Sequence, residues 1–350
     1  MMEQQTKKTR LSRGMKRLLV FASLSVLGLG AVMLFTFSKQ TVTALMNFDP
    51  LYLGALGLIW IISFSSDAVS FIFYTRGTDE RLGVADSYRA AAFRVFFNLV
   101  TPFSFGGQPF VVYFLQRRGV PAGKGSSIVI VKLLIISAYV LLGAGAAFVF
   151  FHNHIARVTV LNDVFLGSAI FQVVFIIVIL AAILQPRLII RAFSSVSNLL
   201  YRWKIIKSKK RRFLQQLVHE TNLARRSFRR YFGRHVVPFV LGTLTIGIMY
   251  FVEAITLWVI FIGLGVRLPF ATGITLGALF LFLLPFLPTP GAAGLGEAFF
   301  VVLFSGIVPY YLLGVAVLLW RFFYNYLTAL AGALFSSRHF SRVIVKSEAG

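Results

Sequence analysis

Six ionisable residues lie inside long apolar stretches of the sequence, where an unpaired charge is costly. They are Asp67, Arg94, Lys132, Glu253, Glu297 and Arg321, three acidic and three basic. At the centre of a bilayer such a charge costs at least ~2.5 kcal/mol, so these residues should pair with each other or line a polar pathway. Arg321 lies near the middle of its apolar run, and we expect Glu297 and Glu253, in the same half of the sequence, to be its partners.

Arg94 and Lys132 lie two or three helical turns from the predicted end of their apolar runs. Long basic side chains near a helix end ordinarily extend to the membrane surface. Two interpretations of Arg94 and Lys132 therefore stay open: extension to the membrane surface, or a role in a binding site. Asp67 would neutralise one of the two.

Two stretches rich in proline and glycine interrupt otherwise apolar sequence, TPFSFGGQP at 101–109 and LPTPGAAGLGE at 287–297. Proline and paired glycines break helices, and a broken helix in lipid must be buried in protein or face a water-filled cavity. Glycine lets a ligand approach the backbone closely, and a helix that starts after a break attracts phosphate or carboxylate. The glycines concerned are Gly106, Gly107, Gly291, Gly294 and Gly296.

Two amide side chains, Asn98 and Gln108, flank the first break. They could bond a headgroup or tie down the backbone of the turn. We predict that both breaks, with the ionisable residues, form one substrate-binding site. The alternative is a pair of tight turns that only pack half-helices together.

The elements that would position these residues are transmembrane helices. Of 350 residues, 58% are hydrophobic, which is more than a soluble protein can bury. Full spans of about 20 apolar residues are expected at 18–37, 51–74, 124–151, 164–184, 236–262 and 309–334. The fold class is therefore all-α, a polytopic membrane protein with about six full spans plus two broken, re-entrant segments at 90–116 and 270–306. The second broken segment is also long enough to be two complete spans.

The distribution of basic residues predicts the topology. With both broken segments returning to the side they enter from, 29 of the 35 Lys and Arg lie on one face, and Lys39, Arg157 and Arg267 on the other. The positive-inside rule makes the first face cytoplasmic. We expect a basic cytoplasmic N-terminus at 1–17, a cytoplasmic tail at 335–350, and a location in the cell membrane.

The order of elements predicts an inverted repeat. The half at 18–151, with its break at 101–109, and the half at 164–334, with its break at 287–297, each read span, span, broken segment, span, but from opposite sides. In such repeats, discontinuous helices meet near the midplane and form the binding site. The alternative is a coincidence between two Gly/Pro turns.

The cytoplasmic loop at 185–235 differs in kind. Within 205–235, apolar residues recur at helical spacing and most of the others are Lys or Arg. This pattern is typical of a basic amphipathic helix on an anionic inner leaflet. The alternative is a solvated loop whose charges only enforce topology; a nucleic-acid partner is not expected.

Other chemistry has little support. The chain has no cysteine, which excludes disulfides and thiolate sites, and no GxxxxGK[ST] loop for ATP. No Ser–His–Asp arrangement is evident. We therefore predict no catalytic residues, no metal, no cofactor and no enzyme activity.

The stretch NLVTPFSFGGQPFVVYFLQRRGV and the span that contains Lys132 resemble the first signature of the lysylphosphatidylglycerol synthase transmembrane-region family, also called the flippase-like domain family. PFLPTPGAAGLGEAFFVVLF resembles its second signature, and LLWRFFYNYLTALAGAL its last span. The similarity runs from about Leu18 to Leu334. The family implies a bacterial or archaeal membrane protein whose best-known members flip aminoacylated phosphatidylglycerol to the outer leaflet.

In those members a soluble aminoacyl-transferase domain follows the membrane part, whereas this sequence is printed to Gly350. The resemblance is therefore to the flippase part alone, without a synthase domain. Gln108 stands where many relatives have an acidic residue, so the resemblance does not identify the lipid.

We expect a lipid flippase or transporter for a phosphate-bearing lipid, with an aminoacylated lipid as one candidate. One alternative is a non-transporting, lipid-binding scaffold for a separate synthase or glycosyltransferase, in which the basic helix would matter most. Another is a membrane-embedded enzyme that acts on a lipid phosphate.

Overall fold

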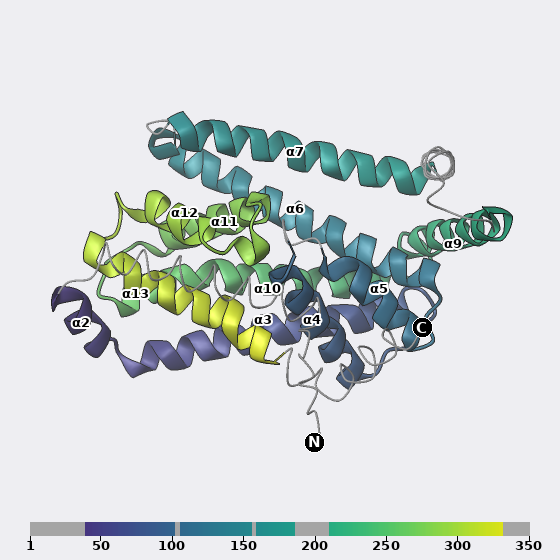
Figure 1. The fold of residues 1–350 in the computed structure, drawn as a ribbon, viewed down its shortest axis with the longest axis horizontal. Coiled ribbons are helices and arrows are strands. Elements are labelled where there is room, and N and C mark those ends of the chain that lie inside the picture. The colour runs from purple at the N-terminus through teal and green to yellow at the C-terminus, as the bar shows by residue number, and fades with distance from the viewer. Residues whose placement is uncertain (1–38, 102–105, 156–158, 186–209, 332–350) are drawn as a thin grey trace, which may run out of the picture.

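The protein is helical throughout the part that the computed structural model describes, residues 39–101, 106–155, 159–185 and 210–331. The first predicted span at 18–37, the N-terminus at 1–17 and the tail at 335–350 lie outside the described residues. The longest helices run roughly along one long axis (Figure 1). The elements are α2 (Lys39–Met46), α3 (Pro50–Arg76), α4 (Val84–Leu99), α5 (Gly107–Arg117), α6 (Ala122–Ile155), α7 (Thr159–Leu184), α9 (Lys210–Tyr231), α10 (Val236–Gly263), α11 (Phe270–Leu283), η2 (Leu284–Phe286), η3 (Pro290–Ala292), α12 (Leu295–Phe304), α13 (Tyr310–Arg321) and η4 (Phe322–Tyr326).

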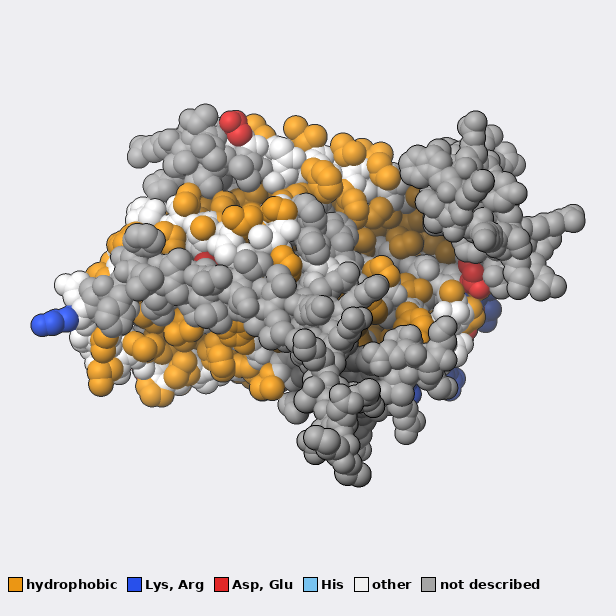
Figure 2. All heavy atoms as spheres, in the orientation of Figure 1, with side chains coloured by type: hydrophobic (Ala, Val, Ile, Leu, Met, Phe, Trp, Pro, Cys, Tyr) orange, Lys and Arg blue, Asp and Glu red, His pale blue; other side chains and the backbone are white. Residues whose placement is uncertain are grey.

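Five helices in the described part are long and apolar enough to cross a membrane, and they confirm five of the six predicted full spans. They are Pro50–Arg76, Ala122–Phe150, Phe165–Leu184, Val236–Gly263 and Tyr310–Ala331. The chain is therefore a multi-pass membrane protein. Hydrophobic side chains cover the flanks of the long axis, and most of the visible charged side chains gather toward its two ends (Figure 2).

Local sequence explains where these helices begin and bend. At the start of α3 the Asp49 carboxylate accepts a hydrogen bond from the backbone N–H of Leu51 at 2.8 Å, and Pro50 occupies the first turn, where its missing N–H does no harm. The last span contains a π-helical turn, η4, directly after Arg321. Such turns shift the register of the side chains that follow and are frequent at functional sites.

The first broken segment forms two short helices that pack against each other. α4 has 16 residues and α5 has 11, so they are about 24 and 17 Å long. Neither length reaches across a hydrocarbon core of about 30 Å. Residues 102–105, at the tip of the predicted break, lie outside the described residues.

The second broken segment is likewise made of short pieces. α11 has 14 residues and α12 has 10, so they are about 21 and 15 Å long. They are joined through η2 and η3, and Phe280 of α11 packs its ring on Phe300 and Phe304 of α12. These lengths favour a re-entrant hairpin over two complete spans.

The two hairpins occupy opposite halves of the long axis. Figure 1 shows α4 and α5 in the half that carries α9, and α11 and α12 in the half that carries α2. They meet in the middle, where α4 contacts η3 and Leu99 forms a small buried cluster with Ala293. The two breaks are thus in contact, and the inverted repeat stays a prediction.

The basic helix α9 packs on the protein at one end of the long axis, mainly against α6. Phe228 and Tyr231 are buried there, and the Tyr231 hydroxyl donates to the carbonyl of Tyr74 at 2.6 Å. Burial raises the pKa of Tyr231 well above its usual range, so the hydroxyl stays a donor. The predicted amphipathic helix is thus present over 210–231, and part of its apolar face contacts protein. Residues 186–209 of the predicted loop lie outside the described part.

Candidate functional site

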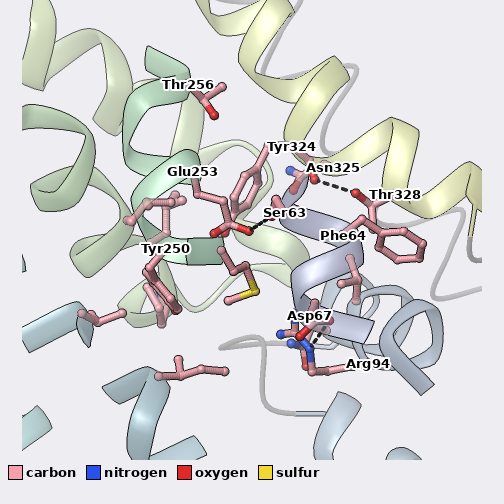
Figure 3. A pocket seen from close by; sticks show the side chains of 18 of the residues that line it. Ser63, Phe64, Asp67, Arg94, Tyr250, Glu253, Thr256, Tyr324, Asn325 and Thr328 are labelled. Carbon is pink, nitrogen blue, oxygen red and sulfur yellow. Dashed lines mark hydrogen bonds and ion pairs between the residues drawn. The ribbon is translucent and has the colours of Figure 1, made fainter. Parts of the chain in front are cut away.

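A polar cavity of about 220 Å³ lies where the two hairpins meet. Its walls come from α3, α4, α5, α6, α7, α10, the stretch around η2 and η3, and the last span. Its lining is mixed, with these polar residues: Ser63, Asp67, Arg94, Asn98, Gln108, Ser137, Gln172, Tyr250, Glu253, Thr256, Tyr324, Asn325 and Thr328. Figure 3 shows Asp67 and Arg94 together on one side, with Ser63, Glu253 and Tyr324 grouped nearby.

One carboxylate holds two cations at the cavity wall. Asp67 Oδ2 accepts from Arg94 Nη2 at 2.9 Å and Nε at 3.1 Å, and Asp67 Oδ1 lies 2.5 Å from Lys132 Nζ. The side chain of Arg94 is 14% exposed, whereas those of Asp67 and Lys132 are 3% and 2% exposed. The cluster carries one more positive than negative charge. Arg94 and Asp67 both line the cavity, and Arg94 is the more exposed of the two.

Lys132 does not extend to the membrane surface, which corrects the default interpretation of long basic side chains near a helix end. Its ammonium donates to Ser70 Oγ at 2.7 Å and to the carbonyl of Asp67 at 3.0 Å, and it lies 3.5 Å from the centre of the Phe71 ring. All these partners belong to α3. The carboxylate, hydroxyl and carbonyl that α3 offers compensate part of the cost of burying this ammonium.

Glu253 of α10 lines the cavity from another side. Its Oε1 accepts a hydrogen bond from Ser63 Oγ at 2.6 Å. Within the described residues, no basic side chain forms an ion pair with it. The expectation that Glu253 partners Arg321 is therefore not met: it faces the cavity beside Tyr324 (Figure 3).

Arg321 and Glu297 form a closed pair behind the second break. Both side chains are fully buried, and Arg321 Nη2 lies 2.6 Å from Glu297 Oε2. Arg321 also donates to the carbonyls of Gly291 at 2.9 Å and Ala292 at 2.7 Å. These carbonyls have lost helical partners at the break, and in lipid each needs a donor. The expected pairing with Glu297 is present, but neither side chain is among the cavity-lining residues.

The backbone of the second break is strained and tightly packed. Gly291, Ala292 and Gly294 have φ values of 56°, 57° and 79°, a region that costs a non-glycine residue about 1–3 kcal/mol. A Cβ at Gly296 would lie 2.8 Å from Arg321 Nη2. Gly291 borders the cavity, whereas Gly294 and Gly296 shape the turn behind it.

The first break is tied down by its own side chains. Asn98 Oδ1 accepts from the N–H of Gly107 at 2.9 Å, and Thr101 Oγ1 accepts from the N–H of Gly106 at 3.0 Å. These two N–H groups at the start of α5 are therefore occupied within the protein. Asn98 holds the turn while it borders the cavity, and Gln108 borders the cavity from α5.

Of the twelve predicted site residues, the structure places five in the cavity lining: Arg94, Asn98, Gln108, Glu253 and Gly291. The other seven lie behind it, as counterions or as parts of the turns: Gly106, Gly107, Lys132, Gly294, Gly296, Glu297 and Arg321. Sequence reasoning missed Ser63, Tyr250, Tyr324, Asn325 and Thr328. The one feature of the sequence that could have identified them is a polar side chain within an apolar span.

The potential metal chemistry is also limited. Within the described residues no group of three or more His, Asp or Glu side chains is arranged to hold a metal ion. The cavity instead offers a guanidinium, two carboxylates, amides and hydroxyls. These groups recognise charged and hydrogen-bonding headgroups.

The chain belongs to the family described as the lysylphosphatidylglycerol synthase TM region, which it matches over residues 19–332. The match covers both halves and both breaks, so the cavity lies within the family's shared region. The family ties this membrane protein to lipid handling. No curated protein matches the chain.

Proposed function

We propose that this protein moves a phosphate-bearing lipid from one leaflet of the cell membrane to the other. The observation that carries the proposal is the meeting of two hairpins of short helices, from opposite ends of the molecule, at one polar cavity. Transporters built from inverted repeats place substrates at such a junction, near the middle of the bilayer.

The charges of the cavity support a headgroup that contains a phosphate. Arg94 reaches the cavity, and its cluster has one excess positive charge because Asp67 also neutralises Lys132. Guanidinium groups bind phosphate oxygens through strong, charge-assisted hydrogen bonds. Glu253 accepts a hydrogen bond from the Ser63 hydroxyl and forms no ion pair within the described residues. It would balance that charge or accept a cationic part of the headgroup, such as an amino acid's ammonium.

The arrangement of the two hairpins supports an alternating-access mechanism. Each hairpin is anchored at its own end of the molecule, and their tips touch through α4 and η3. Movement of one half against the other would open the cavity to one leaflet at a time. We further propose that the end carrying α9 is cytoplasmic, with both termini on that side, since most of the described basic residues outside the apolar spans lie at that end.

The test is a flipping assay in proteoliposomes, with a phosphatidylglycerol that carries a fluorophore on one acyl chain. Arg94→Ala should slow flipping at least tenfold, because a lost charge-assisted hydrogen bond costs about 1.5–3 kcal/mol. Asp67 keeps Lys132 as its partner in this variant, so the fold should persist. Arg89→Ala, on the same helix in a surface pair with Asp86, is the matched control.

Equal flipping by wild type and Arg94→Ala would contradict this assignment of the headgroup site. Absence of protein-dependent flipping, with one lipid strongly enriched in the purified protein, would favour the scaffold function. Conversion of the lipid to a new product would favour an enzyme. Mass spectrometry of the lipids that copurify with the protein distinguishes these results.

A further inference from the structure

A second hollow, an apolar groove of about 510 Å³, opens on the flank of the molecule between α6, α10 and α11. Apart from the hydroxyls of Tyr139 and Tyr250, its side chains are aliphatic, glycine, alanine or phenylalanine. It lies at mid-length of both long helices, at 139–143 of α6 and 244–254 of α10. It therefore faces the hydrocarbon core of the bilayer.

Small residues line part of the groove, and two of them are glycines in tight contact with neighbouring side chains. Gly143 lies so close to α11 that a Cβ there would be 3.0 Å from the Cβ of Ala278, and a Cβ at Gly247 would be 2.7 Å from the Tyr139 hydroxyl. The rim is formed by larger residues that point outward, including Leu142, 69% exposed, and Ile248, 48% exposed. The groove is therefore lined by small residues and bordered by larger apolar side chains.

The groove shares a wall with the polar cavity. Val140, Tyr250 and Leu281 line both hollows. Tyrosine suits such a boundary, because it has an apolar ring and a polar hydroxyl. A molecule that occupies both hollows would need a polar head toward Arg94 and Glu253 and a long apolar tail toward the flank.

We propose that this groove binds one hydrocarbon chain of the lipid whose headgroup occupies the cavity, and that the chain stays in contact with the bilayer through the groove during transport. This inference rests on the proposed function and adds the position of the tail. The groove offers no partner for a charge within its lining, whereas the cavity holds the charged groups. The lipid would therefore enter sideways between α6 and α10.

The experiment uses the full-length protein in proteoliposomes with a phosphatidylglycerol that carries a diazirine at the middle of one acyl chain. After illumination, mass spectrometry maps the adducts. We expect them to concentrate on 139–143 and 244–251, at least fivefold above lipid-facing positions elsewhere on the same helices. Adducts spread evenly over the exposed faces would overturn the proposal.

Tryptophan substitutions at the rim supply matched variants. Ile248→Trp and Leu142→Trp should fill the groove and reduce both the local adducts and flipping at least fivefold. Leu241→Trp and Val149→Trp, each seven residues away at exposed positions outside the groove, should leave both unchanged. Because the adduct map of the wild type needs no variant, poor folding of one variant leaves the test intact.

The outcomes separate this inference from the transport function. Flipping that depends on Arg94, with evenly spread adducts, would refute the groove and leave transport standing. Concentrated adducts without flipping would support a lipid-binding groove and refute transport. Cross-links between two copies of the chain through 142 or 248 would show that a second copy covers the groove, which also refutes the proposal.

Discussion

Removal of Arg321 should destabilise the second break more than any other single substitution considered for this protein. The guanidinium makes hydrogen bonds to Glu297 and to the carbonyls of Gly291 and Ala292, and both charged side chains are fully buried. Arg321→Met keeps the length of the side chain and removes all three hydrogen bonds. It leaves a buried carboxylate without its cation and two carbonyls without donors.

The magnitude follows from these three losses. An ion pair broken inside a protein costs about 3–5 kcal/mol, because one charge stays buried without a partner. Each unsatisfied carbonyl adds about 1–3 kcal/mol. Even with partial relaxation, the loss is on the order of 5 kcal/mol, which is comparable with the whole stability of many domains.

Thermal stability in detergent measures this loss. The protein is heated in steps, and the fraction that still elutes as a monodisperse peak gives the Tm. We expect Arg321→Met to lower Tm by on the order of 10 °C. Arg89→Ala, which breaks a partly exposed surface pair, should change stability by no more than about 1 kcal/mol.

A double variant tests the reasoning about the stranded charge. Arg321→Met with Glu297→Leu removes the carboxylate as well, so it should be more stable than Arg321→Met alone. The carbonyls of the break still lack donors, and the double variant should stay below the wild type. A Tm for Arg321→Met within about 2 °C of the wild type would refute the structural role of this pair.

Three further predictions concern other parts of the molecule. Gly107→Ala pushes a methyl group into the backbone of α4 and should lower Tm by several degrees, whereas Gly145→Ala, which meets open space, should not. Because the chain has no cysteine, Arg267→Cys and Arg118→Cys each provide a single labelling site. An impermeant maleimide should label Arg267→Cys in intact cells and Arg118→Cys only after permeabilisation. The reverse pattern would invert the proposed topology. Tyr231→Phe removes the hydrogen bond that joins α9 to the end of α3 and should cost about 1 kcal/mol, seen as faster proteolysis within 210–231.

Much of the architecture was predictable because it depends on composition over long windows. An apolar run of more than 20 residues has few alternatives to a span, so α3, α6, α7 and α10 were expected within a few residues of their observed ends. The breaks were expected because proline and glycine act locally. The Arg321–Glu297 pair was expected because few counterions exist in that half of the sequence.

The arrangement of side chains around the cavity was less predictable, because it depends on which helices become neighbours. Lys132 is buried because α3 presents Asp67 and Ser70 to it, and no spacing along the chain shows that approach. Ser63 and Tyr324 contribute to the cavity from helices far apart in the sequence. The π-helical turn at 322–326 also shifts the register of the side chains that follow it, and no residue type in the sequence predicts such a turn.

The two buried arginines carry out different tasks, and this difference indicates where substrate recognition lies. Arg321 is fully buried, with two carbonyls and one carboxylate as its partners, so its hydrogen-bonding capacity serves the break. Arg94 bonds a carboxylate that also neutralises Lys132, and its side chain remains partly exposed to the cavity. The two breaks thus differ in their chemistry. Variants that alter lipid choice without loss of stability should therefore arise around Arg94, whereas variants around Arg321 should lose stability first.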